Sequence, residues 1–166
     1  GVRIAVSTAR MIAQVLSVPL VGIKSHEIWA ASCHPQDEGI VAVAFDAKKS
    51  RVFAGLYRLK APGFPVVVSE PSDITFGELM NRMPGTGPVT CIGNGFTRYL
   101  EELKIRAGAE NSRYRLIEGF TPSGRAATML VQNKYNQTPD MYRDYKNTVP
   151  SYERLSDAEC SAGKGR

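Results

Sequence analysis

Apolar positions along the chain form short continuous runs that predict strands, separated by stretches with helical spacing. Ile40 to Phe45 is apolar at every position, which predicts a strand that is covered on both faces. Arg51 to Lys60 returns after the short polar segment 46–50, and a gap of this length predicts an antiparallel hairpin. Three further strands are predicted at Val66 to Ser69, Pro88 to Ile92 and Tyr114 to Ile117.

Helical spacing fills the gaps between the later strands. The first predicted helix places Phe76, Leu79, Met80 and Met83 on one face, and the second does the same with Phe96, Tyr99, Leu100 and Leu103. Thr121 and Pro122 predict the start of a third helix. The predicted order is therefore β-β-β-α-β-α-β-α. This is an α/β fold in the ribonuclease-H-like order, with three antiparallel strands followed by crossovers.

The first residues predict a separate small unit with the order α-β-α. A helix from Ile4 to Leu16 has a stripe of larger apolar residues beside a stripe of alanines, so we expect it to touch a sheet and another helix. A short strand at Leu20 to Ile23 and a helix from Ser25 to Cys33 follow. Because this unit contains no partner strand, we interpret it as the remainder of a first lobe with exposed apolar surface.

The predicted domain boundaries follow from the polar linker His34 to Gly39. We expect residues 1–38 to be the remainder of the first lobe, residues 39–150 to be a complete ribonuclease-H-like second lobe, and residues 151–166 to be a C-terminal tail.

Composition is that of an ordinary globular protein, with 166 residues, 43% hydrophobic and 22% charged. The longest apolar run, Ile40 to Phe45, is far too short for a membrane helix. Cys33, Cys91 and Cys160 share no metal-ligand spacing, which favours reduced thiols in a cytoplasm. The net charge of +5 is spread thinly along the chain, which is more typical of a solvated surface than of a phosphate-binding footprint.

Asp46 is the first candidate for chemistry, because it ends the first long strand, where open α/β sheets place their sites. A two-metal nuclease would need further carboxylates near it. Glu78 belongs to a predicted capping box with Thr75, and the fourth strand ends in Gly93-Asn94 without an acid. Neither a metal site nor a catalytic set is therefore predicted.

The turn Gly93-Asn94-Gly95 lies between a predicted strand and a predicted helix, where backbone N–H groups can hold a phosphate or an adenosine. Together with Asp46 it forms a candidate nucleotide site. The alternative, which we favour, is that Asn94 caps the helix while a glycine makes the turn.

The histidines His26 and His34 are predicted to be loop or cap residues, because their spacing does not suit a metal pair. The C-terminal region alternates tyrosines with basic residues, which could bind a nucleic acid by stacking and phosphate contacts. Acidic residues interrupt this run, so we favour tyrosines that pack back on the second lobe. The run contains Tyr135, Tyr142, Tyr145 and Tyr152 with Lys134, Arg143, Lys146 and Arg154.

Several segments together resemble the TsaB (YeaZ) family. Gly1 to Arg10 resembles the helix that follows the family's GSFT turn, and Pro19 to Ser25 is similar to its P-L-V-G-V-S-S segment. Ala44 to Ala54 is similar to its I-D-A-R-R-G-E-V-Y-A hairpin, with Ser50 in place of the glycine. Pro150 to Arg154 resembles its closing P-x-Y-L-R motif, interrupted by Glu153. The family's opening strands and its GSFT turn have no counterpart in this sequence.

The resemblance implies an ASKHA-type protein of two ribonuclease-H-like lobes. It also implies a cytoplasmic, non-catalytic subunit of the bacterial machinery that places threonylcarbamoyl on an adenosine of tRNA, with no cofactor of its own. The implied partners are a TsaD-type ligase and a TsaE-type ATPase, with a homodimer when the ligase is absent and tRNA contact only through the complex. The residues that match the family's interface helix are Arg3, Ser7, Arg10, Met11 and Gln14.

Two other functions remain alternatives at this point. An ATP-binding kinase or ATPase of the ASKHA superfold would use Asp46 and the turn from Gly93 to Gly95. A glycoprotease-like peptidase would need a metal or nucleophile site, which the sequence does not suggest.

Overall fold

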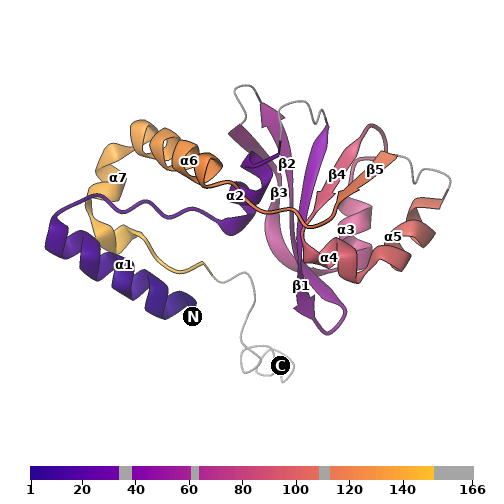
Figure 1. Cartoon of the computed structure of the whole chain (residues 1–166), viewed down its shortest axis with the longest axis horizontal. Helices are drawn as coiled ribbons and strands as arrows, with labels where there is room; N and C mark the ends of the chain where they lie inside the picture. The colour runs from indigo at the N-terminus through magenta and orange to yellow at the C-terminus, as the bar shows by residue number, and fades with distance from the viewer. Residues whose placement is uncertain (34–38, 61–63, 109–112, 152–166) are drawn as a thin grey trace, which may run out of the picture.

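A five-stranded mixed sheet forms the centre of the molecule, which is a computed structural model that describes residues 1–33, 39–60, 64–108 and 113–151 (Figure 1). The strand order is β3-β2-β1-β4-β5. The first three strands pair antiparallel, whereas β4 pairs parallel to both β1 and β5. The strands are β1 (Ile40–Lys48), β2 (Arg51–Lys60), β3 (Phe64–Thr75), β4 (Val89–Ile92) and β5 (Tyr114–Ile117).

Helices cover both faces of this sheet, which explains why β1 is apolar at successive positions. On one face α3 (Phe76–Arg82), α4 (Asn94–Arg98) and α5 (Leu100–Ala107) enclose a core with Ala42, Ala44 and other buried residues. On the other face, α2 (Ser25–Ala31) packs over Val41, Val43 and Tyr57. The alternate residues of one strand therefore supply two separate cores.

The predicted order of strands and helices in residues 39–150 is present in the structure. The predicted second helix is divided at Tyr99, whose non-helical backbone separates α4 from α5. The third strand is much longer than the predicted 66–69, because its polar second half still pairs with β2. Most of the predicted linker (residues 34–38), the turn residues 61–63 and the tail residues 152–166 lie outside the described residues.

The prediction of a strand at Leu20 to Ile23 is wrong. This segment is not in a strand, and its Leu20 N–H donates to the Tyr142 carbonyl, 3.0 Å away. A strand needs a neighbouring strand to take its hydrogen bonds, and the described residues place none beside this segment.

The remaining helices lie on the far side of α2 from the sheet (Figure 1). They are α1 (Val2–Leu16), α6 (Gly124–Gln137), α7 (Pro139–Arg143) and the short 3-10 helix η2 (Tyr145–Asn147). Helix α6 packs on α2, whereas α1 contacts η2. The expectation that α1 packs against a sheet is therefore wrong, because the one sheet of the described residues lies away from it (Figure 1).

The tyrosines of the C-terminal region are half-buried at Tyr135, Tyr142 and Tyr145. The backbone of this region contacts the N-terminal segment: the Tyr142 carbonyl accepts from the Leu20 N–H, and η2 contacts α1. The expected packing of the tyrosine side chains on the second lobe stays a prediction, and Tyr152 lies outside the described residues.

Helix α3 begins with the predicted capping box, which is confirmed. The Thr75 hydroxyl accepts from the Glu78 N–H at 3.2 Å, and the Glu78 carboxylate accepts from the Thr75 N–H at 2.7 Å. This backbone hydrogen bond, with a further one from the Thr75 hydroxyl, holds the pKa of Glu78 below its usual value.

We expect this box to give the protein part of its acid sensitivity. A carboxylate with a lowered folded pKa stabilises the fold above its unfolded pKa of about 4.3, and this stability is lost as the pH falls through the lower folded pKa. Thermal unfolding of wild type and Glu78→Gln should therefore show a larger decrease in Tm for wild type between about pH 6 and about pH 3. Equal decreases would show that the Glu78 contact does not contribute.

Candidate functional site

Helix α1 turns its apolar face to solvent. The side that contacts the rest of the chain carries Val6, Ala9, Arg10 and the buried Ala13. Larger apolar side chains on the opposite side are exposed, from 51% at Ile12 to 76% at Val15. Residues at these spacings share one side of a helix. We call this side the apolar α1 face; its members are Ile4, Met11, Ile12, Val15 and Leu16.

The interface residues expected from the sequence form a stripe along one edge of this face. Arg3, Ser7, Met11 and Gln14 are exposed, and their spacing of three to four residues places them in line. Arg10 is different, because it is half-buried and donates from Nε to the Thr148 carbonyl at 2.8 Å. The structure therefore brings the five residues together, but it places Arg10 in a contact within the chain.

Two segments that are far apart in the sequence, residues 20–22 and 146–148, hold α1 in place. Arg10 donates a second hydrogen bond to the Lys146 carbonyl, and the Thr148 hydroxyl donates to the Leu20 carbonyl at 2.8 Å. Gly22 adjoins the same place, since a side chain there would lie 3.2 Å from the Thr148 methyl group. These contacts position α1 without covering its apolar face.

The second candidate, around Asp46, is a tightly packed turn. The favoured prediction, that Asn94 caps α4, is wrong. Gly93 occupies the cap position, and no side chain caps the helix. The Asn94 Oδ1 instead accepts from the Asp46 N–H at 3.0 Å. This hydrogen bond joins the end of β1 to the start of α4. The side-chain oxygen of Asn94 is therefore already bonded within the protein.

The glycines of this turn are explained by close approach of the backbone. A Cβ on Gly93 would lie 2.2 Å from the Ala44 carbonyl oxygen, and one on Gly95 would lie 2.9 Å from the same atom. Gly93 also has a φ of 104°, which side-chain-bearing residues rarely adopt. The expected turn between strand and helix is present, and α4 has only five residues.

The Asp46 carboxylate is held by its own neighbours. The Lys48 N–H donates to Oδ1 at 2.9 Å and the Lys48 ammonium to Oδ2 at 3.2 Å. The backbone N–H of Lys48 is the main reason that the pKa of Asp46 lies below its usual value, with the Lys48 and Arg98 charges adding to it. Asp46 is therefore ionised at neutral pH, with its oxygens bonded to Lys48.

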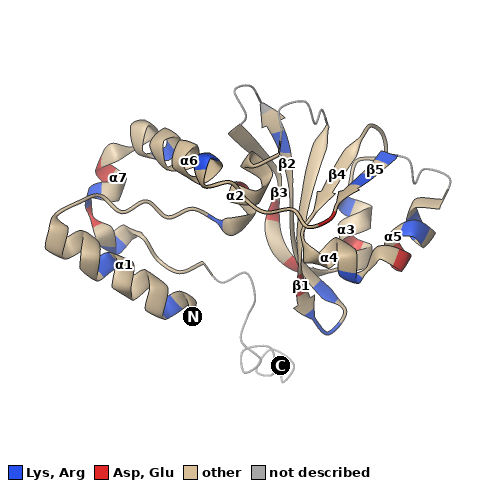
Figure 2. Cartoon of the chain, in the orientation of Figure 1, with Lys and Arg blue, Asp and Glu red and all other residues tan. Residues whose placement is uncertain are grey.

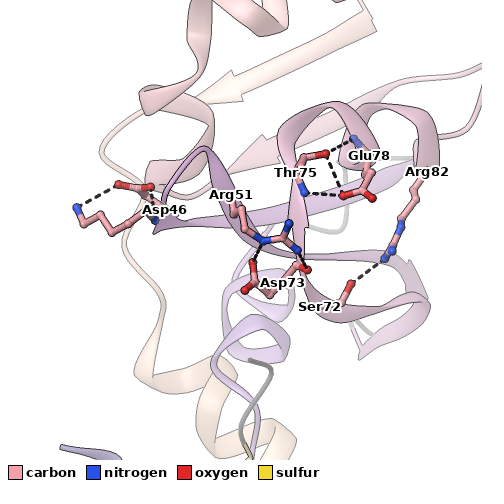
Figure 3. A network of polar contacts seen from close by, with 8 residues as sticks. Asp46, Arg51, Ser72, Asp73, Thr75, Glu78 and Arg82 are labelled. Atoms are coloured by element: carbon pink, nitrogen blue, oxygen red, sulfur yellow. Dashed lines mark hydrogen bonds and ion pairs between the residues drawn. The ribbon is translucent and has the colours of Figure 1, made fainter. Parts of the chain in front are cut away.

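Polar residues at this end of the sheet form pairs rather than a metal cage (Figure 3). Asp73 accepts from Arg51 Nε at 2.7 Å, and Arg82 donates to Ser72 at 2.7 Å. Over the described ranges, no group of three His, Cys, Asp or Glu residues could hold a metal ion. Asp46 and Asp73 thus pair with basic side chains, whereas Glu78 caps α3.

Among the described residues, the histidine and the two cysteines are in the packed interior. His26 lies in the first turn of α2, buried, with Nε2 3.1 Å from the Phe53 carbonyl and its ring against Phe45. It is therefore not the loop or cap residue that we expected. Cys33 and Cys91 are buried and not disulfide-bonded, and burial raises the pKa of Cys91 to about 12. The Cys91 thiol therefore stays protonated and unreactive at neutral pH.

Sequence reasoning missed that Ile4, Ile12 and Val15 are surface residues. The predicted stripe of larger apolar residues, which was expected to touch a sheet, contains all three, because an amphipathic pattern shows only that a face needs covering. The useful signal was the lack of a partner strand in residues 1–38, from which exposed apolar surface was correctly expected.

No helix of the described part of the chain is long and apolar enough to cross a membrane.

Comparison with known proteins gives consistent matches. A family model described as TsaD, tRNA N6-adenosine threonylcarbamoyltransferase, matches residues 1–84. The chain is 26% identical over 159 residues to the tRNA threonylcarbamoyladenosine biosynthesis protein TsaB of Bacillus subtilis (strain 168). This alignment covers 96% of the chain and 66% of that protein, so the chain spans slightly less than two thirds of its relative's length.

Two solved structures share the fold. One is a Pseudomonas aeruginosa protein described as uncharacterized with similarity to peptidase YEAZ, with a TM-score of 0.70 and 20% identity over 93% of this chain and 68% of that one. The other is YeaZ from Pseudomonas aeruginosa, with a TM-score of 0.65 and 19% identity over 90% of this chain and 67% of that one. The family model covers more than half of the chain, and the TsaB protein aligns over nearly all of it. The chain is similar to TsaB in sequence and to YeaZ in fold, and it belongs to the TsaD family described as tRNA N6-adenosine threonylcarbamoyltransferase.

Proposed function

We propose that this chain acts in tRNA threonylcarbamoyladenosine biosynthesis as a non-catalytic subunit that binds a TsaD-type ligase through α1. The name of the TsaB relative supports the pathway. The observation that carries the binding role is the apolar α1 face, which is exposed beside the stripe of Arg3, Ser7 and Gln14. An apolar patch with a polar edge is the usual form of a protein interface.

The proposal extends to the finer architecture and to the assembly. The strand order β3-β2-β1-β4-β5, with three antiparallel strands first, supports an ASKHA-type, ribonuclease-H-like lobe in residues 39–150. Residues 1–38 would then be the remainder of the first lobe, and residues 151–166 the tail. We place the protein in the cytoplasm, with a TsaE-type ATPase as a further partner and a homodimer through the same face when the ligase is absent. We leave the kinase, ATPase and peptidase alternatives aside.

The test is association with a TsaD-type ligase subunit, measured by sedimentation equilibrium. We expect a heterodimer for wild type and an affinity about tenfold to a hundredfold weaker for Val15→Asp, because a charge in the middle of an apolar interface loses its hydration. Val15 is 76% exposed, so its replacement leaves the fold of the free chain intact.

The matched control is Ile105→Asp, which places the same charge at a residue that is 79% exposed on α5. This variant should bind as wild type does. Equal affinity of Val15→Asp and wild type, or no heterodimer at all, would exclude α1 as the site through which this chain recognises the ligase.

A further inference from the structure

Asn94 is the one asparagine of the sequence that is followed by a glycine. A side chain on the following residue hinders its backbone nitrogen from approaching the asparagine side chain, and glycine has none. The pair Asn94-Gly95 is therefore the place where this chain is chemically most prone to deamidation.

Deamidation at this pair is a reaction within the chain that needs only water. The Gly95 backbone nitrogen forms a bond to Asn94 Cγ, the Cγ–Nδ2 bond breaks, and Nδ2 leaves as ammonia with the proton of the Gly95 N–H. Water then opens the cyclic imide at either of its carbonyls. One opening gives an aspartate. The other, which predominates in unstructured peptides, gives an isoaspartate, in which the main chain runs through the former side-chain carbons.

The folded structure prevents the first step. The imide ring requires a non-helical backbone at Asn94, whereas Asn94 is the first residue of α4. Its Oδ1 accepts from the Asp46 N–H at 3.0 Å, which fixes the side chain on β1. The Phe96 N–H donates to the Gly93 carbonyl at 3.2 Å and closes the first turn of the helix. The ring can therefore form only after α4 has come away from β1.

An isoaspartate does not fit back into this junction. It lengthens the main chain between Gly93 and Gly95 by one carbon–carbon bond, about 1.5 Å. Both glycines are buried against the Ala44 carbonyl oxygen, which a Cβ would approach to 2.2 Å at Gly93 and to 2.9 Å at Gly95. A close-packed interior has no room for the additional carbon.

An aspartate suits the same position. Its carboxylate can accept the Asp46 N–H as the amide oxygen does, and it would lie in the first turn of α4, four residues before Arg98. Basic residues gather at the end of β1 and on α4 (Figure 2), and Lys48 pairs with the Asp46 carboxylate at 3.2 Å. The added charge is therefore compensated, and only the lengthened main chain is excluded.

We propose that Asn94-Gly95 is a deamidation site that the β1–α4 junction protects, and that its isoaspartate product prevents the chain from refolding. Each opening of α4 exposes the pair to a reaction that closing the helix does not reverse. The pair thus limits how long a chain can stay open and still return to the native fold. The inference is independent of the proposed function, because neither α1 nor a partner takes part.

The first experiment compares folded and unfolded wild type at mildly alkaline pH, without and with urea. Isoaspartate is measured by enzymatic methylation and located by mass spectrometry of peptides. We expect it to form at position 94 at least about tenfold more slowly without urea, because opening a packed helix costs free energy. In urea, Asn94→Gln should form none at this position. Equal rates for folded and unfolded wild type would show that the junction does not protect the pair.

The second experiment dilutes urea-aged samples and measures by circular dichroism the fraction that refolds. We expect the fraction of wild type that fails to refold to rise in step with its isoaspartate content. Asn94→Gln, aged equally, should refold as its fresh sample does, and fresh Asn94→Asp should refold as fresh wild type does. The proposal is overturned if chains with isoaspartate refold like the others. It is also overturned if fresh Asn94→Asp fails to refold, because charge rather than chain length would then be the cause.

Discussion

Replacing Gly93 with alanine is expected to destabilise the protein by about 3 kcal/mol or more. The new Cβ would lie 2.2 Å from the Ala44 carbonyl oxygen, which belongs to the central strand and cannot move aside. The backbone at Gly93 adds to this, because its φ of 104° is strained for any residue with a side chain. Urea unfolding followed by circular dichroism measures the change.

The control for this variant is Gly85→Ala. A Cβ at Gly85 meets no atom within 4 Å, so we expect the free energy of unfolding to change by less than about 0.5 kcal/mol. If Gly93→Ala unfolds at the same urea concentration as Gly85→Ala, then the β1–α4 junction is not packed as described. If Gly93→Ala is insoluble while Gly85→Ala is soluble, the result supports close packing at the β1–α4 junction, as a large loss of stability would.

A matched pair of leucine variants should differ by several kcal/mol in their effect on stability. Leu79 on α3 is 1% exposed in the core against Phe76 and Ile74, so Leu79→Ala should cost about 2–5 kcal/mol. Leu16 on α1 is 63% exposed, and Leu16→Ala should change stability by less than about 0.5 kcal/mol.

The pair also tests whether the apolar α1 face is uncovered in the free chain. Both substitutions remove the same atoms, so the difference between them reports burial alone. A similar loss for both variants would mean that another part of the chain, or a second copy, covers α1 in solution. Measurement at two protein concentrations separates these cases, because association makes the midpoint depend on concentration.

The sheet was predictable because its signals are local. Ile40 to Phe45 is apolar at successive positions, which is typical of a strand enclosed on both faces. The Thr75–Glu78 capping box likewise involves residues three apart, so the start of α3 followed from the sequence.

The parts that could not be predicted depend on distant contacts. Asn94 was expected to cap its own helix, but its partner is Asp46, 48 residues earlier in the chain. The amphipathic pattern of α1 was correct, yet it did not reveal that Val15 faces solvent, because nothing local in the sequence specifies what covers a face. The Leu20 segment was expected to be a strand, and only the position of Tyr142 shows where its hydrogen bond goes.

The contact of Arg10 with Thr148 has a consequence for how the protein is made. The two residues are 138 positions apart, so α1 is positioned by a segment that leaves the ribosome long after it. Until that segment has been synthesised, Ile4, Val15 and the rest of the apolar α1 face are attached to a helix that nothing orients. Nascent chains in this state are prone to aggregation and are the usual substrates of chaperones. We therefore expect a nascent chain that ends before residue 148 to bind a chaperone, and a nascent chain that extends beyond residue 148 to be released from it.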